Sequence, residues 1–276
     1  MGTTSHALFA LGYTEPTSQT PMFQFSERDT GTGFVTVAEE VPIALVYNGR
    51  PHVVLMGTPA DLEDLAVGFS LTEEIVATPD DVERIDIVKA SHGIELQIQI
   101  GAEDAERLEM RTRSLVARTS CGLCGIETIK DVLRVPEKVA HTLDISRSAM
   151  YLAGHELSKR QTLNNQTSTV HAAGWSNAFG EILIVREDVG RHNALDKVLG
   201  AMARSGVASN AGFIVVTSRA SYEMVQKVAI RGVELIAAIS RPTGLAIRFA
   251  LDAGVTLVGL LRGTSANVYT GPQRIT

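Results

Sequence analysis

Two cysteines, the only ones in a chain of 276 residues, stand three positions apart in the stretch RTSCGLCGIET. Each is followed by a glycine, Gly122 and Gly125, which leaves the backbone unusually permissive. We therefore expect a mobile loop that presents Cys121 and Cys124. Residues 107–120 hold four arginines and one glutamate, and nearby cations stabilise a thiolate relative to a thiol. Because a thiolate attacks disulfide and persulfide sulfur, the stretch predicts reactive sulfur chemistry.

Three other interpretations of the cysteine pair stay open. A structural zinc site needs four ligands, whereas the pair supplies two and no histidine stands at ligand spacing from it, so only a dimer could complete the site. We therefore expect no metal. A thioredoxin-like disulfide exchanger also uses C-x-x-C, but early in a small βαβ domain rather than after a basic segment in mid-chain. The pair could also be two small loop residues without a function.

The composition is that of an ordinary globular protein, with 45% hydrophobic and 20% charged residues. A net charge of −6 does not favour binding to nucleic acid or membranes, and no 18-residue apolar run predicts a transmembrane helix. The N-terminal stretch lacks the basic start and long apolar core of a signal peptide. We therefore expect a flexible N-terminal tail and a cytoplasmic location, where paired cysteines are more often reactive or metal-binding than structural.

The elements before the cysteines predict a small α+β unit. Two β-rich runs within residues 34–57 flank Asn48-Gly49, a strong hairpin signal. A helix is expected to start near Thr58, because apolar residues then recur at helical spacing. Residues 84–100 predict a second hairpin, and the basic segment that follows is expected to be helical or extended.

The second half of the chain predicts a different architecture. An amphipathic helix is expected over residues 144–160, and beyond it strands and helices alternate. Strands are expected within residues 168–175, 180–188, 211–218, 234–240 and 255–261. This alternation predicts an α/β sandwich with a mixed or parallel sheet. In open sheets of this kind, ligands bind beyond the carboxyl ends of the strands.

Polar residues gather at three of the expected strand ends. EDVGRHNALDK places Asp188 as the expected N-cap of a helix, with His192 and Asp196 four residues apart on one face. Anions bind at helix N-termini, and hydroxyls and guanidiniums add phosphate contacts. Helix capping alone is an alternative explanation for the cluster around His192 and for Ser221, and the stretch at residues 259–270 is not a Walker A loop. Three polar clusters together nevertheless indicate a phosphorylated or nucleotide-like ligand. The candidate residues are Arg191, His192, Asn193, Ser218, Arg219, Ser221, Arg262, Gly263, Thr264 and Ser265.

His171 is a further candidate, although it stands in the apolar strand TVHAAGW. A lone histidine in such a strand is more often a core residue with its hydrogen bonds satisfied than a ligand.

Several motifs in order resemble the FdhD family of formate dehydrogenase accessory sulfurtransferases. They are AEEVPIALVYNG, AVGFSLTEEI, RTSCGLCG, EDVGRHNALDK, SRASYEMVQK and the C-terminal TLVG and VYTGPQR. The resemblance runs from about residue 38 to the C-terminus, and the tail before about residue 30 carries none of it.

The resemblance implies a function. Members take sulfur from a cysteine desulfurase as a persulfide and pass it to the molybdenum cofactor in its bis(molybdopterin guanine dinucleotide) form, for formate dehydrogenase. It implies that Cys121 carries the persulfide and that Cys124 is the second catalytic cysteine. It also implies a homodimer and a cofactor-binding segment made of Leu260, Leu261, Arg262, Gly263, Thr264 and Ser265.

The resemblance further implies a cytidine-deaminase-like, three-layer α/β/α domain over residues 141–276. A smaller α+β domain would span residues 31–140 and a flexible tail residues 1–30. Deaminases hold zinc with H-x-E and P-C-x-x-C. Here His192-Asn193-Ala194 lacks the glutamate and Ser218–Ser221 lacks the cysteines, so no catalytic zinc is expected. We therefore expect a sulfurtransferase; the alternatives are a C-x-x-C thiol-disulfide oxidoreductase and a non-covalent molybdenum-cofactor chaperone.

Overall fold

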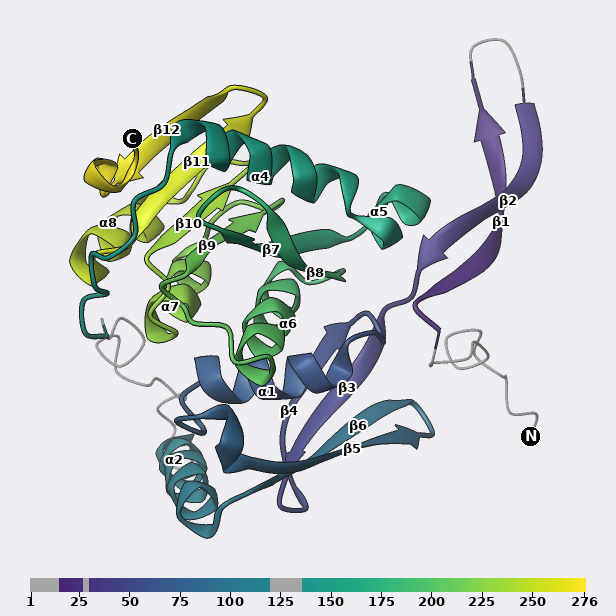
Figure 1. Cartoon of the computed structure of the whole chain (residues 1–276). Coiled ribbons are helices and arrows are strands. Elements are labelled where there is room, and N and C mark those ends of the chain that lie inside the picture. Colours follow the sequence, from purple (N-terminus) through teal and green to yellow (C-terminus); the bar gives the residue numbers. More distant parts are fainter. Residues whose placement is uncertain (1–14, 27–29, 120–135) are drawn as a thin grey trace.

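The computed structural model describes residues 15–26, 30–119 and 136–276 (Figure 1). Cys121 and Cys124, and the loop expected around them, lie outside the described residues. Within the described ranges the chain forms two units, each with its own sheet and hydrophobic core, and a separate two-stranded hairpin (Figure 1).

The first unit is a four-stranded sheet with helix α1 (Leu62–Thr72) packed on one face. Its strand order is β4-β3-β6-β5. The strands are β3 (Val41–Tyr47), β4 (Arg50–Gly57), β5 (Val82–Ala90) and β6 (Gly93–Ile100), and the short 3-10 helix η2 (Pro79–Asp81) leads into β5. The predicted hairpin turn is confirmed, because Asn48 and Gly49 have φ values of 48° and 79°, which a two-residue turn between twisted strands requires.

The hairpin precedes this unit and projects from the body of the protein (Figure 1). Its strands are β1 (Thr17–Phe25) and β2 (Thr30–Ala38), which pair antiparallel along their whole length. Residues 17–25 were expected in a flexible tail and instead form β1. The β-rich run predicted from residue 34 is divided between β2 and β3, because β2 pairs only with β1.

The second unit is a six-stranded sheet in the order β12-β11-β10-β9-β7-β8. Strands β9, β10 and β11 are parallel, whereas β7 is antiparallel to both β8 and β9, and β12 is antiparallel to β11. The bounds are β7 (His171–Asn177), β8 (Ile182–Asp188), β9 (Gly212–Val216), β10 (Leu235–Ala238), β11 (Thr256–Arg262) and β12 (Ser265–Thr270), followed by the 3-10 helix η3 (Pro272–Arg274). The predicted mixed sheet is therefore confirmed.

Helices cover both faces of this sheet and give three layers (Figure 1). Helices α6 (Arg191–Arg204), α7 (Tyr222–Ile230) and α8 (Gly244–Ala253) pack on one face. Helix α4 (Arg147–Lys159) packs on the other, close to the predicted helix over 144–160, and the short α5 (Thr162–Thr167) follows it.

The two units meet where α1 crosses α6 without intervening side chains. A methyl group added to Gly68 would lie 1.8 Å from the Asp196 carbonyl oxygen, and one added to Gly200 would lie 1.9 Å from the Asp64 carbonyl oxygen. Only glycine allows backbones to approach this closely. The junction therefore fixes the position of α6, whose N-terminus carries one of the predicted clusters.

Candidate functional site

Strand ends converge at one edge of the six-stranded sheet. Strands β8, β9, β10 and β11 end there, and the antiparallel β7 begins there, so that His171 lies opposite Asp188 in the register. The amino ends of α6 and α7 and the turn between β11 and β12 follow these strand ends. The tertiary structure therefore brings all three predicted clusters, and His171, to the same edge of the sheet.

The imidazole of His192 connects the first two clusters. Its Nε2 lies 2.7 Å from Glu223 Oε2 and 3.4 Å from Ser221 Oγ. Burial lowers the pKa of His192; the carboxylate of Glu223 opposes this shift, and the neighbouring cations, Arg191 foremost, add to it. The ring is therefore mainly neutral near neutral pH, with one nitrogen able to donate and the other to accept.

Arg191 supplies a donor that the described residues do not use. Its Nε is buried and has no hydrogen-bond partner among them. Burial lowers the pKa of His171, the Arg191 charge lowers it further, and Asp188 opposes both. An unpartnered buried N–H is costly, and an anionic ligand would satisfy it through a charge-assisted hydrogen bond. His171 is itself half-buried at this edge of the sheet, so it is not one of the enclosed residues of the apolar core.

Two residues that were predicted to contact a ligand instead form hydrogen bonds within the protein. Asn193 is 7% exposed, and its Nδ2 donates to Met56 O at 2.8 Å and to Asp188 Oδ1 at 3.1 Å. Ser218 is 4% exposed, and its Oγ donates to Arg219 O at 3.0 Å. These contacts are suited to holding the turns in place rather than to contacting a ligand.

The turn between β11 and β12 is shaped by its backbone. Leu260 has a φ of 54°, rare for a residue other than glycine, and its N–H donates to Ser240 O at 3.2 Å. Leu261 is buried in the core beneath α4, and Arg262 Nε donates to a backbone carbonyl at 3.3 Å. The exposed remainder of the turn is Gly263, Thr264 and Ser265.

The Asp188 carboxylate holds the start of α6 in place through hydrogen bonds. Its fully buried carboxylate accepts hydrogen bonds at Oδ1 from Gly190 N (2.7 Å) and Asn193 Nδ2, and at Oδ2 from Thr58 N (3.1 Å) and Lys197 Nζ (2.6 Å). The expectation that Asp188 is the N-cap is wrong, because Gly190 holds that position. The carboxylate instead ties the turn before α6 to the first unit, and this turn carries the arginine and histidine of the site.

A second buried ion network joins the units and was not predicted from the sequence. Lys227 Nζ lies 2.9 Å from Glu73 Oε1, 3.1 Å from Asp196 Oδ2 and 2.9 Å from Thr72 Oγ1. Burial alone would lower the pKa of Lys227, but the two carboxylates outweigh it and raise the pKa. Asp196 therefore faces α1 rather than the site. The sequence feature that could have indicated this network is Lys227 itself, which stands within the mostly apolar run MVQKVAI.

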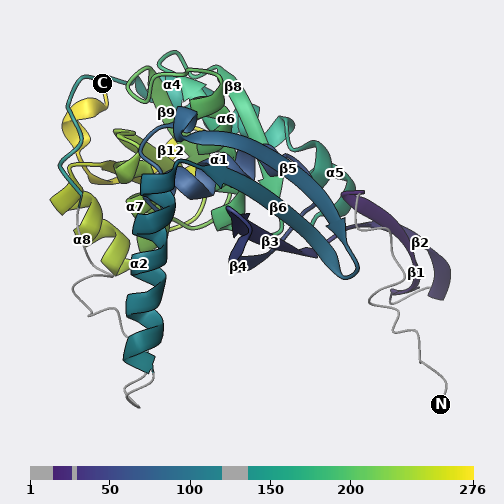
Figure 2. The same ribbon diagram turned by 90° about the horizontal axis from the view of Figure 1, so that it is seen from below.

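Helix α2 (Ala102–Thr119) leads from the first unit toward the cysteines in the sequence and projects beyond the sheet (Figure 2). Arg107 Nη2 donates to Ile75 O and Arg111 Nη1 donates to Glu73 O, both at 2.9 Å. These carbonyls lie just after α1, so the two arginines anchor α2 there. The basic segment is helical, and Arg111, expected to stabilise a thiolate, makes a structural contact.

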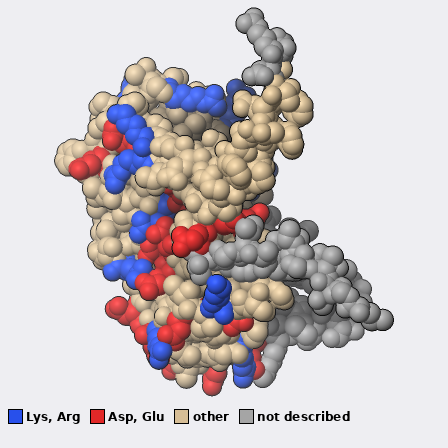
Figure 3. Space-filling model, turned by 90° about the vertical axis from the view of Figure 1, so that its right-hand side faces the viewer, with Lys and Arg blue, Asp and Glu red and all other residues tan. Residues whose placement is uncertain are grey.

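Ion pairs also cross the junction between the two units. Figure 3 shows acidic and basic side chains close together on one side of the protein. Asp64 on α1 accepts from Arg186 Nε on β8 at 2.8 Å and from Arg204 Nη1 on α6 at 2.6 Å. These three side chains are therefore paired with one another across the junction.

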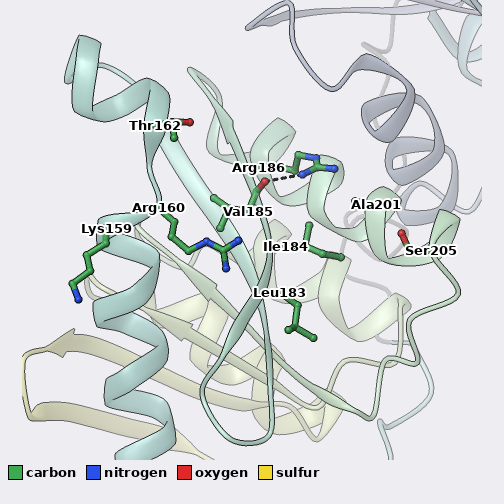
Figure 4. A pocket seen from close by; sticks show the side chains of 9 residues that line it. All are labelled: Lys159, Arg160, Thr162, Leu183, Ile184, Val185, Arg186, Ala201 and Ser205. Atoms are coloured by element: carbon green, nitrogen blue, oxygen red, sulfur yellow. Dashed lines mark hydrogen bonds between the residues drawn. The ribbon is translucent and has the colours of Figure 1, made fainter.

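A hollow of about 530 Å³ lies beside the outer edge of β8 (Figure 4). Two arginines from its lining donate to carbonyls of this strand: Arg160 to Ile182 O, and Arg186 Nη1 to Val185 O at 2.8 Å. They cover part of an edge strand that would otherwise present unpaired backbone groups. None of the predicted site residues lines the hollow.

No three His, Cys, Asp or Glu side chains within residues 15–26, 30–111 and 136–276 are grouped to hold a metal ion. Among the described helices, none is both long and apolar enough to cross a membrane.

The fold and the site define a mixed α/β protein with a polar site at the edge of its larger sheet and a helix that precedes a cysteine pair in the sequence. The chain belongs to the FdhD/NarQ family, whose model matches residues 38–276. The family resemblance stated from the motifs is thereby confirmed.

Relatives and a solved structure agree with this assignment. A protein named sulfur carrier protein FdhD from Cupriavidus necator is 50% identical over 239 residues, which cover 87% of this chain and 83% of the relative. Its namesake from Xanthomonas campestris pv. campestris strain B100 is 51% identical, covering 87% and 85%. The crystal structure of a proposed formate dehydrogenase accessory protein from Desulfotalea psychrophila matches with a TM-score of 0.75 at 25% identity, over 94% of this chain and 99% of that one.

Proposed function

We propose that this chain is a cytoplasmic sulfurtransferase that carries sulfane sulfur from a cysteine desulfurase to the molybdenum bis(molybdopterin guanine dinucleotide) cofactor and so activates formate dehydrogenase. The observation that carries the proposal is the match over 239 residues, at about half identity, to proteins named sulfur carriers. The description of the structural neighbour as a formate dehydrogenase accessory protein supports the recipient.

The carrier step needs a thiolate that attacks the terminal sulfur of the donor persulfide. The donor's S–S bond breaks, a new S–S bond forms on Cys121, and the donor departs as a thiolate, so no external oxidant or reductant is consumed. The glycine-flanked C-x-x-C and the arginines of residues 107–120 support this role. Cys124 would act as a second carrier, a resolving thiol or an aid to Cys121.

The acceptor carries pyrophosphates and guanines, and the polar sheet edge supports its binding as a substrate. Arg191, with its unpartnered Nε, would contact a phosphate, together with the N–H groups at the start of α6. His192 and Ser221 would supply further hydrogen bonds at the start of α7. Arg219 and the turn Leu260 to Ser265 would border the same site, and Asn193 and Ser218 would position it.

We further infer that the second unit has the cytidine-deaminase-like arrangement that the resemblance implies. The three layers and the mixed sheet of the second unit support this inference.

Intact mass spectrometry after incubation with a cysteine desulfurase and L-cysteine tests the sulfur transfer. We expect the purified protein to gain one sulfur atom, the gain to be reversed by a thiol reductant, and Cys121→Ala to abolish it. No gain, with a desulfurase that is active toward another acceptor, would contradict the proposal.

The cysteine variants also separate the alternatives. A thiol-disulfide oxidoreductase needs both cysteines, so Cys121→Ala and Cys124→Ala would be equally inactive in reducing a disulfide substrate. A non-covalent cofactor chaperone needs neither, so both variants would still support maturation of formate dehydrogenase. A sulfurtransferase depends chiefly on the carrier, Cys121.

Calorimetric titration with guanosine diphosphate, a fragment of the proposed acceptor, tests the sheet-edge site. We expect Arg191→Gln to weaken binding by roughly 10- to 100-fold, because a hydrogen bond to a charged group is removed. Arg84→Gln is the matched control, since Arg84 is an exposed arginine on β5 that pairs only with Asp86 among the contacts described. Equal affinities for both variants would exclude Arg191 from the nucleotide site.

A further inference from the structure

Strand β8 lies at the edge of the six-stranded sheet, and one of its two long sides has no strand beside it. Within the described chain β8 pairs only with β7. The open side of an edge strand presents backbone N–H and C=O groups that a further polypeptide segment can bind. Here the open side borders the hollow of about 530 Å³ shown in Figure 4.

The strand register shows which backbone groups face the open side of β8. Ala172 O on β7 accepts a hydrogen bond at 3.0 Å from the N–H group that follows β9, so the backbone of Ala172 points toward β9. Backbone groups point alternately to the two sides of a strand, so those of Ala173 point toward β8 and meet Arg186, the direct partner of Ala173. The backbone groups of Leu183 and Val185 therefore point away from β7 and toward the open side.

The charged side chains that line the hollow are all basic. They are Lys159, Arg160 and Arg186. Arg186 is already paired with Asp64 at 2.8 Å, across the junction of the two units. Arg160 has no carboxylate partner among the described residues, and Lys159 pairs with Glu156 at 3.4 Å on the surface. Two cations beside the open side of β8 can therefore bind acidic side chains of another molecule.

We propose that the open side of β8 binds an extended acidic segment of a partner protein, which adds a seventh strand to the sheet. The main chain of the segment would pair with Leu183 and Val185, and its acidic side chains would contact Lys159 and Arg160. Charge complementarity favours an acidic sequence, and the directional backbone groups favour a polypeptide over other polyanions. Leu183 is 48% exposed, so an apolar residue of the segment would cover it.

Two arginines occupy carbonyl groups of β8 in the unbound protein, and the incoming segment would replace them. Arg160 donates to Ile182 O, and Arg186 Nη1 donates to Val185 O at 2.8 Å. N–H groups of the added strand would take over these carbonyls, and the released Arg160 guanidinium would bind a carboxylate of the segment. The hydrogen bonds that are given up are thereby replaced, partly by stronger charge-assisted ones.

The bound segment would lie close to the polar sheet edge without occupying it. β8 ends at Asp188, and α6 begins three residues later. None of the predicted site residues lines the hollow, so a partner segment and a ligand at the sheet edge could be bound together. The proposed surface goes beyond the proposed sulfur transfer and does not depend on it.

Fluorescence anisotropy with the full chain and a labelled peptide tests the proposal. The probe is a peptide of about eight residues, the length of an ordinary strand, in which glutamate and valine alternate. We expect it to bind, and we expect the double variant Lys159→Glu, Arg160→Glu to raise the dissociation constant at least about 10-fold, because two attractive charge contacts become repulsive. Arg147→Glu is the matched control, since Arg147 is an exposed arginine of the same helix α4 outside the lining of the hollow. The control is expected to change the dissociation constant by less than about 3-fold.

A second peptide separates strand pairing from charge attraction. It has the same sequence but is N-methylated throughout, so it keeps the carboxylates and loses every backbone N–H donor. We expect its dissociation constant for the parent protein to be at least about 10-fold higher. Both peptides are compared on the parent protein, so this result does not depend on how well the double variant folds.

Four outcomes would overturn the proposal. The first is no binding of the glutamate peptide to the parent protein at concentrations up to about 1 mM. The second is equal affinity of the double variant and the Arg147→Glu control. The third is equal affinity of the two peptides, which would show charge attraction without strand pairing. The fourth is displacement of the peptide by an equal concentration of oligothymidylate, which would show a general polyanion site. None of these measurements needs a sulfur donor, so their outcome is independent of the proposed sulfur transfer.

Discussion

Replacing Lys197 by methionine tests the view that the buried pair with Asp188 holds the site in place. The ammonium of Lys197 is fully buried and has two partners, Asp188 Oδ2 at 2.6 Å and Thr58 O at 3.0 Å. Methionine fills a similar volume without the charge. The change therefore leaves the Asp188 carboxylate in the interior with one donor fewer.

The loss of stability follows from the contacts that remain. Removing one partner of a buried ion pair costs roughly 3–5 kcal/mol. Asp188 keeps three N–H donors, from Gly190, Thr58 and Asn193, and these continue to stabilise its charge. We therefore expect Lys197→Met to lower the free energy of unfolding by about 3 kcal/mol, at the lower end of this range. In the double variant Asp188→Asn, Lys197→Met the buried charge is gone, and we expect it to be more stable than the single variant by about 1 kcal/mol or more.

Urea unfolding followed by fluorescence of Trp175, the single tryptophan, measures these differences. Trp175 lies in β7 and is 1% exposed, so it reports on the core of the second unit. Far-UV circular dichroism must give the same transition if unfolding is two-state. The control is Lys159→Met, whose lysine is 59% exposed and pairs with Glu156 at 3.4 Å; we expect a change within about 0.5 kcal/mol. A loss below about 1 kcal/mol for Lys197→Met, or no recovery in the double variant, would refute the reasoning.

Two further predictions concern the junction and the histidines. Gly200→Ala is expected to lower the free energy of unfolding by about 2 kcal/mol or more, because the added methyl group would lie 1.9 Å from the Asp64 carbonyl oxygen. The control in the same urea assay is Gly101→Ala, whose added methyl group would have no atom within 4 Å. Equal losses for the two variants would contradict the close crossing of α1 and α6. The pKa values of His171 and His192 are lowered, so the unfolded chain binds protons that the folded chain does not, and stability should fall as the pH drops below about 6.5. Each histidine changes the free energy of unfolding by at most about 1.4 kcal/mol per pH unit, and His171→Gln should make the pH dependence less steep. A free energy of unfolding that stays constant between about pH 7.5 and 5.5 would show that the pKa shifts of the two histidines are absent.

Local pattern determined much of the architecture. Asn48-Gly49 predicted a turn that the structure has, because the φ values required there belong to these residue types. The alternation of strands and helices after residue 144 predicted the mixed sheet, since the spacing of apolar residues that distinguishes a helix from a strand is local in the sequence. The ordered motifs from about residue 38 to the C-terminus also predicted the family, which the comparisons confirm.

Tertiary structure decided which residues meet. His192 and Ser221 are 29 positions apart, and only the arrangement of strands around β9 brings them within 3.4 Å. Asn193 and Asp196 belong to the same polar motif as His192, yet one bonds to Met56 O and the other to Thr72, because the first unit packs against that side of α6. The sequence could not separate ligand-facing from structural polar residues within one helix, since burial depends on a neighbour more than a hundred residues away. Likewise, only the register of β1 and β2 places Phe34 opposite Pro21, on the face of the hairpin that also carries Phe23 and Phe25.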